Sequence, residues 1–317
     1  MGGSVTDPLV CVVVLSWNRQ DETLACLASL RPLLGLRRRA ILVDNGSEDG
    51  TPDAAAVAFP EIEVLRNERN LGFAAGNNVG IRRALTAGAD YVALLNDDTV
   101  VDPGYLEALV SAAGGDPRAG FLSSTILSHE RRDEVWFAGA SLSLLTGRSR
   151  HLGAGRLERE ISPEIRETDR PCTCSMLVSR RLLEEVGLME ERLFLYAEEL
   201  DWALRARKMG FHALVVPSSR VWHRLSTSTG CAPSGDAHYY SVRNTLSVLA
   251  WHAPLRPGFL NEVRAALVVG AYIASLFTMG IPKCRGLGRI LRGVRDYRRG
   301  VLGPLRAADT CASPSAS

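Results

Sequence analysis

The fold that we expect for this 317-residue chain is decided by the stretch Leu9-Val10-Cys11-Val12-Val13-Val14-Leu15. The polar residues Ser16-Trp17-Asn18-Arg19 follow it directly. A continuous apolar run rich in valine predicts a strand that is buried on both faces. Strands of that kind are typical of parallel sheets with helices on both sides. Open α/β sheets bind ligands beyond the carboxyl ends of their strands, so the polar residues after this strand mark a candidate site.

The same pattern continues through the first hundred residues. Further strands are expected at residues 40–43, 62–65 and 91–95, with helices at 22–34, 52–59 and 75–87 between them. Alternation of strand and helix implies right-handed βαβ units. The expected fold class is therefore α/β, with a mostly parallel twisted sheet and helices on both faces.

The second half adds fewer strands and more helices. We expect a strand at 173–179, a helix at 180–186, a helix ending at Gly210, and a last core strand at 211–216 that is closed by Pro217. Helices at 236–250 and 257–281 begin a C-terminal helical extension. This organisation divides the chain into a sheet domain at 1–225, a helical region at 226–306 and a disordered tail at 307–317.

Composition excludes some partners and favours one compartment. The net charge of +2 gives no reason to expect a nucleic-acid partner. Seven cysteines without a disulfide-like spacing favour a reduced, cytoplasmic setting. The Cys172-Thr173-Cys174 pair has no second pair or nearby histidine, so it predicts packing in a strand and not a zinc site.

The extension contains features of a membrane-binding surface. Residues 265–282 carry no charge, a run at the lower limit for a membrane span. The next residues place Leu287, Ile290, Leu291 and Val294 on one side of a helix and arginines on the other. A basic amphipathic helix of this kind binds anionic membrane surfaces. We therefore expect peripheral attachment to the inner face of the plasma membrane, with core packing or a homodimer interface as the alternatives.

Each of the first four predicted strands ends in polar residues. Because parallel strands end at the same edge of a sheet, these residues should lie close together. The first strand is followed by Ser16 and Asn18, the second by Asp44 and Asn45, the third by Asn70, Gly72, Asn77 and Asn78, and the fourth by Asn96, Asp97 and Asp98.

These clusters, in this order, resemble glycosyltransferase family two, the inverting GT-A group, and its rhamnosyltransferase-like branch. The matching stretches are VVVLSWNR, VDNGSEDGT, NLGFAAGNN, LLNDDT, FLYAEELDWALRARKMGF, VWH and YYSVRN, which together span roughly residues 9 to 250. The resemblance implies a GT-A nucleotide-sugar-binding and catalytic domain. It also implies transfer of a sugar from a nucleotide-diphosphate donor to an acceptor hydroxyl, with inversion.

The resemblance gives the strand-end residues roles in donor binding. Asp44 would accept a hydrogen bond from the imide of uracil or thymine, although an Asp in an Asp-Asn-Gly-Ser loop is also a good turn residue. Asn77 and Asn78 would face the nucleotide, unless they only cap a helix. The remaining donor-binding candidates are Ser16, Asn18, Asn45, Asn70, Gly72, Asp97 and Asn96, the last of which is a candidate ribose contact.

Metal and base are implied by two acidic motifs. Asp98 is the expected ligand of Mn²⁺ or Mg²⁺, and His223 is a second ligand or a structural histidine. Glu199 stands where relatives carry the base that deprotonates the acceptor, and Asp201 is the second candidate. Acids also favour helix N-termini, which explains part of the Glu198, Glu199 and Asp201 cluster.

Other classes fit the sequence less well. A nucleotidyltransferase would carry a glycine-rich loop after the first strand, and a Rossmann dehydrogenase would carry G-x-G-x-x-G there. A catalytically inactive, membrane-associated scaffold would have lost the acids that this chain keeps. The branch favours dTDP-rhamnose as donor, with UDP or GDP sugars left open. The acceptor is expected to be a glycan, a lipid-linked molecule or a small molecule.

Overall fold

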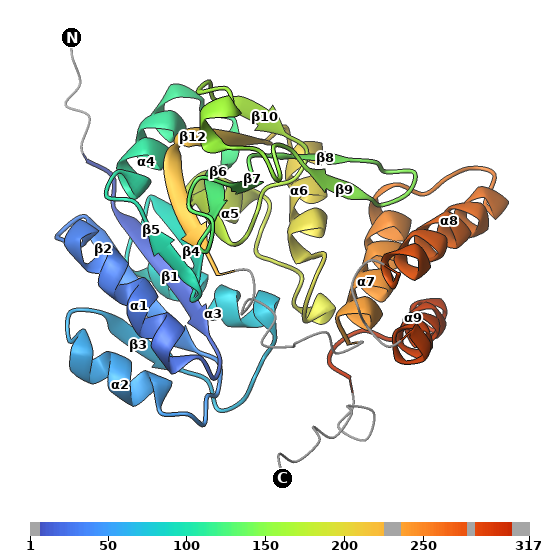
Figure 1. Ribbon diagram of the computed structural model, residues 1–317, viewed down its shortest axis with the longest axis horizontal. Helices are drawn as coiled ribbons and strands as arrows, with labels where there is room; N and C mark the ends of the chain where they lie inside the picture. The colour runs from blue at the N-terminus through green and yellow to red at the C-terminus, as the bar shows by residue number, and fades with distance from the viewer. Residues whose placement is uncertain (1–6, 225–235, 278–282, 306–317) are drawn as a thin grey trace.

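The computed structural model describes residues 7–224, 236–277 and 283–305, and its described part is built around one ten-stranded mixed sheet (Figure 1). The strand order is β10-β12-β6-β11-β4-β1-β2-β3, with β5 paired to β12 and β7 paired to β6. The bounds are β1 Val10–Ser16, β2 Arg38–Asp44, β3 Glu63–Arg66, β4 Tyr91–Asn96, β5 Thr99–Val101, β6 Ala119–Ser128, β7 Val135–Phe137, β10 Arg166–Thr168, β11 Ser175–Ser179 and β12 His212–His223. A separate hairpin consists of β8 Ala140–Leu142 and β9 Ser149–His151.

Helices cover both faces of this sheet, as the sequence predicts. The helices of this part are α1 Gln20–Leu30, α2 Thr51–Ala58, α3 Phe73–Thr86, α4 Tyr105–Gly115, α5 Arg180–Glu185 and α6 Glu198–Lys208, with short 3₁₀ helices at Arg31–Leu33, Glu158–Glu160 and Glu191–Leu193. Buried residues of α1, α2 and α4 pack on one face. Those of α3, α5 and α6 pack on the other.

Strand β1 lies between these two layers. Val10, Val12 and Val14 point into the layer of α1 and α4, while Cys11 and Val13 point into the layer of α3. Helix α3 packs closely against β1 because it presents Gly80 there. A Cβ at Gly80 would lie 2.3 Å from a methyl carbon of Val13. The continuous apolar run in the sequence therefore reflects burial on both faces.

The last core strand corrects one expectation. Pro217 was expected to close it, yet β12 continues to His223. The pairing of β12 with β6 shifts register between Val216 and Arg220. Proline cannot donate to a ladder and is tolerated at such an irregularity, so the strand bends there and does not stop. Its second half pairs with β5 and brings His223 opposite Thr99.

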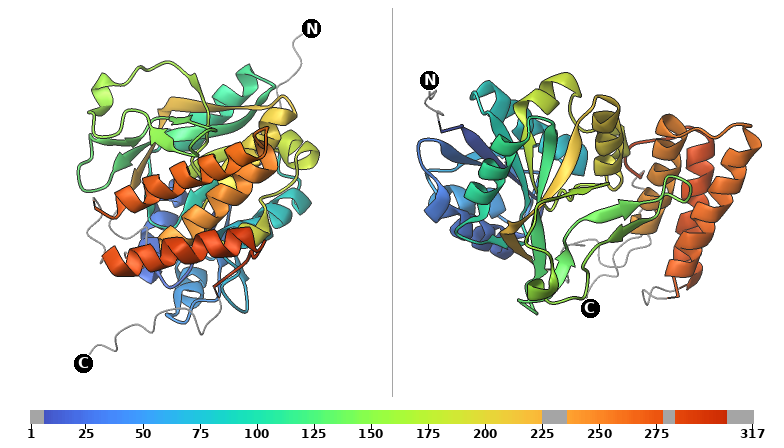
Figure 2. Two further views of the ribbon diagram at one scale, coloured as in Figure 1. Left: turned by 90° about the vertical axis from the view of Figure 1, so that its right-hand side faces the viewer. Right: turned by 90° about the horizontal axis from the view of Figure 1, so that it is seen from above.

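Three helices follow the sheet and stack beside it (Figures 1 and 2). They are α7 Asp236–His252, α8 Phe259–Ser275 and α9 Lys283–Arg298. Helix α7 packs on α6, and α8 and α9 pack on α7. Within the described ranges, none of the helices is long and apolar enough to span a membrane. The tail at 307–317 and part of the uncharged run lie outside the described residues.

The amphipathic face of α9 differs from the expectation. Ile290 and Val294 pack against Val242 and Leu246 of α7, whereas Leu287 and Leu291 are exposed. The predicted single apolar side is therefore split. One half of it holds α9 onto the protein, and the other half faces outward.

Candidate active site

The carboxyl ends of the first four parallel strands form the edge that the sequence predicts. The pairing places Ser16 opposite Asp44 and Asp44 opposite Arg66. On the other side of β1, Leu15 lies opposite Asn96. Residues that are up to 81 positions apart in the chain, such as Leu15 and Asn96, therefore meet at one edge because strand register brings them there.

Asp44 is held rigidly and keeps one oxygen without a partner. Its Oδ2 accepts hydrogen bonds from the backbone N–H groups of Gly46 at 3.2 Å and Ser47 at 3.1 Å. Its Oδ1 is buried and has no hydrogen-bond partner among the described residues. One oxygen of Asp44 therefore stabilises the turn, and the other is available as a hydrogen-bond acceptor.

Asn45 holds the next loop in place. Its amide nitrogen donates to Asn70 Oδ1 at 3.1 Å and to the Gly72 carbonyl at 3.2 Å. Its Oδ1 accepts from Asn67 Nδ2 and from the Leu71 N–H, each at 3.1 Å. All hydrogen-bonding positions of this buried side chain are used within the protein. The structure therefore assigns Asn45 to the loop and not to the ligand.

The other strand-end residues divide in the same way. Asn18 bridges two loops, because its N–H donates to Ser47 and its Oδ1 accepts from the Glu48 N–H. Ser16 is buried and shares a hydrogen bond with Thr23 at 2.7 Å. Asn77 is buried and donates to the Phe73 carbonyl inside its own helix. Of these residues, Asn18 remains exposed at the edge.

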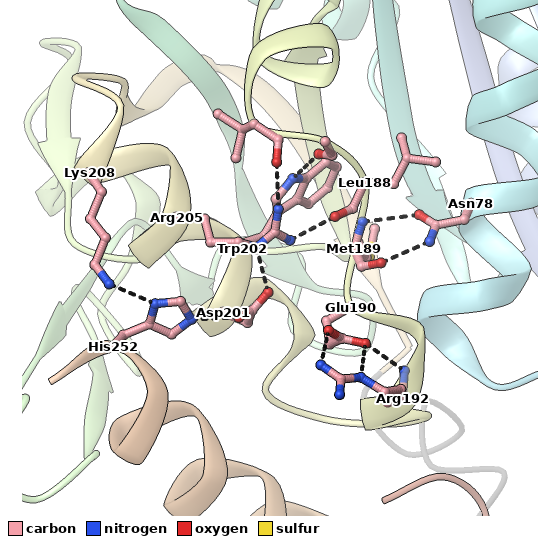
Figure 3. A network of polar contacts seen from close by, with 12 residues as sticks. Asn78, Leu188, Met189, Glu190, Arg192, Asp201, Trp202, Arg205, Lys208 and His252 are labelled. Atoms are coloured by element: carbon pink, nitrogen blue, oxygen red, sulfur yellow. Dashed lines mark hydrogen bonds and ion pairs between the residues drawn. The ribbon is translucent and has the colours of Figure 1, made fainter. Parts of the chain in front are cut away.

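Asn78 makes its hydrogen bonds inside the protein. It is fully buried, and its amide donates to the Met189 carbonyl at 2.9 Å and to Glu191 at 3.0 Å, as Figure 3 shows in part. Its Oδ1 accepts from the Met189 N–H at 3.2 Å. Asn78 therefore ties α3 to the segment before α6.

The acidic motif after β4 meets His223 and a basic residue from the first strand end. Arg19 donates to Asp98 Oδ2 at 2.8 Å and to Asp97 at 3.4 Å. His223 Nε2 lies 3.1 Å from Asp98 Oδ1. Burial and the neighbouring Asp98 charge raise the pKa of Asp97 to about 7. Burial opposes ionisation of Asp98 too, but hydrogen bonds and charge from His223 and Arg19 outweigh it and hold its pKa below the ordinary value.

This cluster has the donor atoms that a hard divalent cation needs. Asp98 Oδ1 and both ring nitrogens of His223 are buried and make no hydrogen bond of good geometry within the described structure. A carboxylate oxygen beside an imidazole nitrogen is a suitable pair for Mn²⁺ or Mg²⁺. In the described ranges, no group of three His, Cys, Asp or Glu side chains is arranged to hold a metal by itself. The residues therefore fit a site that is shared with a ligand.

The acids at the start of α6 point in different directions. Glu199 is buried and forms an ion pair with Arg170. Glu198 is buried beside it, and its Oε2 has no partner among the described residues. Burial and the Glu199 charge raise the pKa of Glu198 to about 8. Tyr272 of α8 lies near enough to Arg170 and Glu199 to sense both charges, so the C-terminal helices contribute to this end of the site.

Asp201 is engaged elsewhere (Figure 3). Its Oδ2 accepts from Arg205 at 2.8 Å, and its Oδ1 lies 2.7 Å from His252 Nε2 at the end of α7. His252 in turn contacts Lys208 at 3.1 Å. Both oxygens of Asp201 are therefore engaged, one within α6 and the other in the contact between α6 and α7, which makes it the weaker candidate for a base.

Comparison with known proteins now decides the family. Residues 11–187 match the family model described as Glycosyl transferase family 2. The chain belongs to glycosyltransferase family 2. It is 32% identical over 279 residues to the N-acetylglucosaminyl-diphospho-decaprenol L-rhamnosyltransferase of Mycobacterium tuberculosis, covering 78% of this chain and 87% of the relative. It is 22% identical over 254 residues to the dTDP-rhamnosyl transferase RfbF of Shigella flexneri, covering 78% and 82%.

Solved structures confirm the GT-A fold of this glycosyltransferase. GalNAc-T7 with UDP, GalNAc and Mn²⁺ aligns with a TM-score of 0.62 at 16% identity, covering 93% of this chain and 55% of that one. A mannosyltransferase from Pyrobaculum calidifontis, in complex with GDP-Man and Mn²⁺, aligns with a TM-score of 0.57 at 15% identity, covering 93% and 88%. At these identities the likeness concerns the fold.

Two residues of the glycosyltransferase site were missed from the sequence. Arg19 stands at the end of the first motif, and its place after a buried strand was the available signal. Arg170 has no local signal, because its partner Glu199 lies 29 positions further along the chain. Trp136 of β7 lies beside two histidines. Its ring centroid is 5.2 Å from that of His223 and 4.7 Å from that of His151.

Proposed function

We propose that this glycosyltransferase is metal-dependent and inverting, and that it transfers rhamnose from dTDP-rhamnose to a hydroxyl of a lipid-linked glycan. The observation that carries the proposal is the sheet edge itself. It carries the unpartnered oxygen of Asp44 and the Asp98–His223 pair, and the chain also holds buried acids at the start of α6. The names of two relatives as rhamnosyltransferases support the choice of sugar.

The nucleotide-sugar donor would be bound by an unpartnered carboxylate oxygen, a metal ion and an arginine at this edge of the sheet. Asp44 Oδ1 would accept the imide N–H of thymine, which uracil also offers. Asp98 and His223 would hold Mn²⁺ or Mg²⁺, which when bound offsets negative charge on the leaving diphosphate. Arg19 lies between Asp97 and Asp98 and would donate to a phosphate oxygen.

Transfer needs one base on the acceptor side. The acceptor oxygen bonds to the anomeric carbon while the bond from that carbon to the diphosphate breaks, and the electron pair leaves with the diphosphate. Glu199 takes the hydroxyl proton in this step. Arg170 orients Glu199 through their ion pair. A single displacement inverts the configuration of the anomeric carbon.

A donor screen tests the proposal. Thermal shift with Mn²⁺ and dTDP-rhamnose should raise the Tm more than UDP or GDP sugars do, because a ligand that binds only the native state stabilises it. Incubation with a polyprenyl-diphosphate-linked N-acetylglucosamine should then release dTDP, and EDTA should stop the release. Release of pyrophosphate would indicate a nucleotidyltransferase. No turnover with any donor or acceptor would leave the scaffold alternative.

Replacement of the base gives a sharper test. Glu199→Gln keeps the size of the side chain and removes the basic site, so turnover should fall by about 10²-fold or more, while the Kd for the donor stays nearly unchanged. Glu198→Gln is the matched control, because it alters a neighbouring acid that we do not assign as the base. Near-normal turnover of Glu199→Gln would move the base to another residue.

We further propose that the outer faces of α8 and α9 contact an anionic membrane. Phe259, Val263 and Leu267 are exposed at a spacing of four residues on α8, and Leu287 and Leu291 are exposed on α9. Exposed arginines at 295, 298 and 299 lie at the end of α9. An apolar stripe bordered by arginines fits an anionic lipid surface, which is where a lipid-linked acceptor would be found.

A further inference from the structure

The short segment that leads into α6 has a strained backbone. We call residues 193–197 the strap. Three of its non-glycine residues have positive φ, namely Phe194 at 67°, Tyr196 at 67° and Ala197 at 66°. The Leu195 N–H donates to the Leu193 carbonyl at 2.8 Å, which closes a γ-turn of the disfavoured hand at Phe194. Such a conformation is unfavourable for a residue with a side chain, and it persists only when the surroundings hold it.

Helix α7 supplies this hold through two buried side chains. Asn244 Nδ2 lies 2.9 Å from the Leu193 carbonyl, 2.8 Å from the Leu195 carbonyl and 2.9 Å from the Tyr196 carbonyl. Arg243 Nη2 donates to the Leu193 carbonyl at 3.0 Å. Both side chains are completely buried. Four contacts from adjacent residues of one helix therefore converge on the carbonyl groups of the strap.

The orientation of the Asn244 amide is fixed by chemistry. Its Oδ1 accepts a hydrogen bond from Arg243 Nε at 2.8 Å. A guanidinium can only donate and a backbone carbonyl can only accept, so the amide oxygen must face Arg243 and the amide nitrogen must face the strap. Arg243 thus both binds the strap and aligns the second residue that binds it.

The loop between β3 and α3 also contacts the strap. The Phe73 N–H donates to the Phe194 carbonyl at 2.7 Å. Gly72 has a φ of 86°, and a Cβ at that position would lie 2.5 Å from the Phe194 carbonyl oxygen. The strap is therefore fixed between the loop that follows β3 and helix α7. It ends where α6 begins, and Glu198 and Glu199 are the first two residues of that helix.

We propose that Arg243 and Asn244 are positioning residues for this reaction, which hold the strap so that Glu199 keeps the geometry needed for transfer. The inference rests on the proposed function in which Glu199 is the base. The chain after α9 takes part as well, because Arg243 Nη1 donates to the Gly303 carbonyl and the Gly303 N–H donates to the Arg192 carbonyl, each at 2.7 Å. The helical extension therefore completes the active site in addition to any surface it offers.

The test compares two asparagines that clamp backbone in the same extension. Asn244→Ala removes the donors to the strap, and Asn244→Asp keeps the shape but replaces the donating nitrogen with an acceptor. Asn261→Ala is the matched control, because the hydrogen bonds of Asn261 go to Leu255, Gly258 and Arg264. We expect kcat to fall at least about tenfold in both Asn244 variants, since small misplacements of a catalytic group are costly. The Kd for the donor should stay within about twofold in every variant.

Hydrogen exchange gives a second readout that does not depend on activity. Amides of residues 193–200 should exchange faster in the Asn244 variants than in the wild-type chain or in Asn261→Ala. Arg243→Lys, which keeps the charge and loses the forked geometry, provides a milder variant if Asn244→Ala fails to fold. It should show the same pattern, with a smaller loss of kcat.

Each outcome decides the inference. A normal kcat for the Asn244 variants, in a protein whose Glu199→Gln variant is inactive, would overturn the inference and leave the proposed function standing. An equal loss of kcat in Asn261→Ala would show that only general stability is involved. If the wild-type chain transferred no sugar, the proposed function would fail. Unchanged hydrogen exchange at residues 193–200 in the Asn244 variants would separately show that Asn244 does not hold the strap.

Discussion

Single atoms without partners carry most of the functional argument at the residue scale. Asp44 Oδ1 and His223 Nδ1 are buried and have no partner within the described structure, whereas Asp98 Oδ1 and His223 Nε2 face each other at 3.1 Å without a hydrogen bond of good geometry. Buried polar atoms are normally satisfied, and exceptions call for a ligand, an ion or water. Their position at one sheet edge is therefore best explained by a shared ligand.

The role of Asp44 can be measured by binding. Asp44→Ala should weaken both dTDP and UDP by about ten- to a hundredfold, the effect of losing one hydrogen bond to a charged acceptor. Isothermal titration calorimetry with Mn²⁺ checks this, and circular dichroism checks that the turn at Gly46 and Ser47 survives. Unchanged affinity would show that Asp44 serves only the turn.

Sequence reasoning at this scale identified which strand ends carry polar residues but not what each side chain binds. Asn45 and Asn78 belong to motifs of the family, yet both are used to hold loops. Arg170 could not be found, because its importance comes from a distant partner. Polar residue types are visible in a sequence, whereas the direction of a side chain depends on packing that the whole chain determines.

At the scale of helices and strands, the sequence predicted the presence of each element better than the residues at which it begins and ends. The apolar runs located the parallel strands and the periodic stretches located the helices to within a few residues. The bend in β12 was missed because Pro217 was expected to stop the strand, while neighbouring strands on both sides keep it in the sheet. The Cys172–Cys174 pair precedes β11 and does not lie in it, although Cys174 is packed in the core as expected.

The contact between α6 and α7 predicts a distinct result for Asp201. Asp201→Asn should lower the free energy of unfolding by about 1.5–3 kcal/mol, because Arg205 and His252 lose a charged partner. The turnover of the protein that stays folded should remain close to normal. Urea unfolding and initial rates, measured beside Glu199→Gln, separate these effects. A stable Asp201→Asn protein without activity would make Asp201 the base.

At the scale of the whole molecule, the extension has an inner and an outer role. Its inner side binds the strap through Arg243 and Asn244. Its outer side exposes the apolar stripe of α8. Removing the extension would destroy both at once, so surface substitutions are the better test of membrane binding.

The triple variant Phe259→Ser, Val263→Ser and Leu267→Ser should reduce co-sedimentation with vesicles that contain anionic lipid. The loss follows from the removal of exposed apolar surface that would otherwise insert. Transfer to a soluble acceptor analogue should be unchanged, which serves as the control for folding. If vesicle binding persists and the mass in solution halves, the stripe is a homodimer interface.

The stereochemistry of the product tests the central claim most directly. We expect that the wild-type protein, given dTDP-rhamnose, Mn²⁺ and an acceptor, forms a glycoside whose anomeric configuration is opposite to that of the donor. Nuclear magnetic resonance of the first product formed measures this from the anomeric carbon–hydrogen coupling. Inversion is required by one displacement with Glu199 as base on the acceptor side. A product that retains the donor configuration would contradict the account, because retention cannot arise from a single displacement at that carbon.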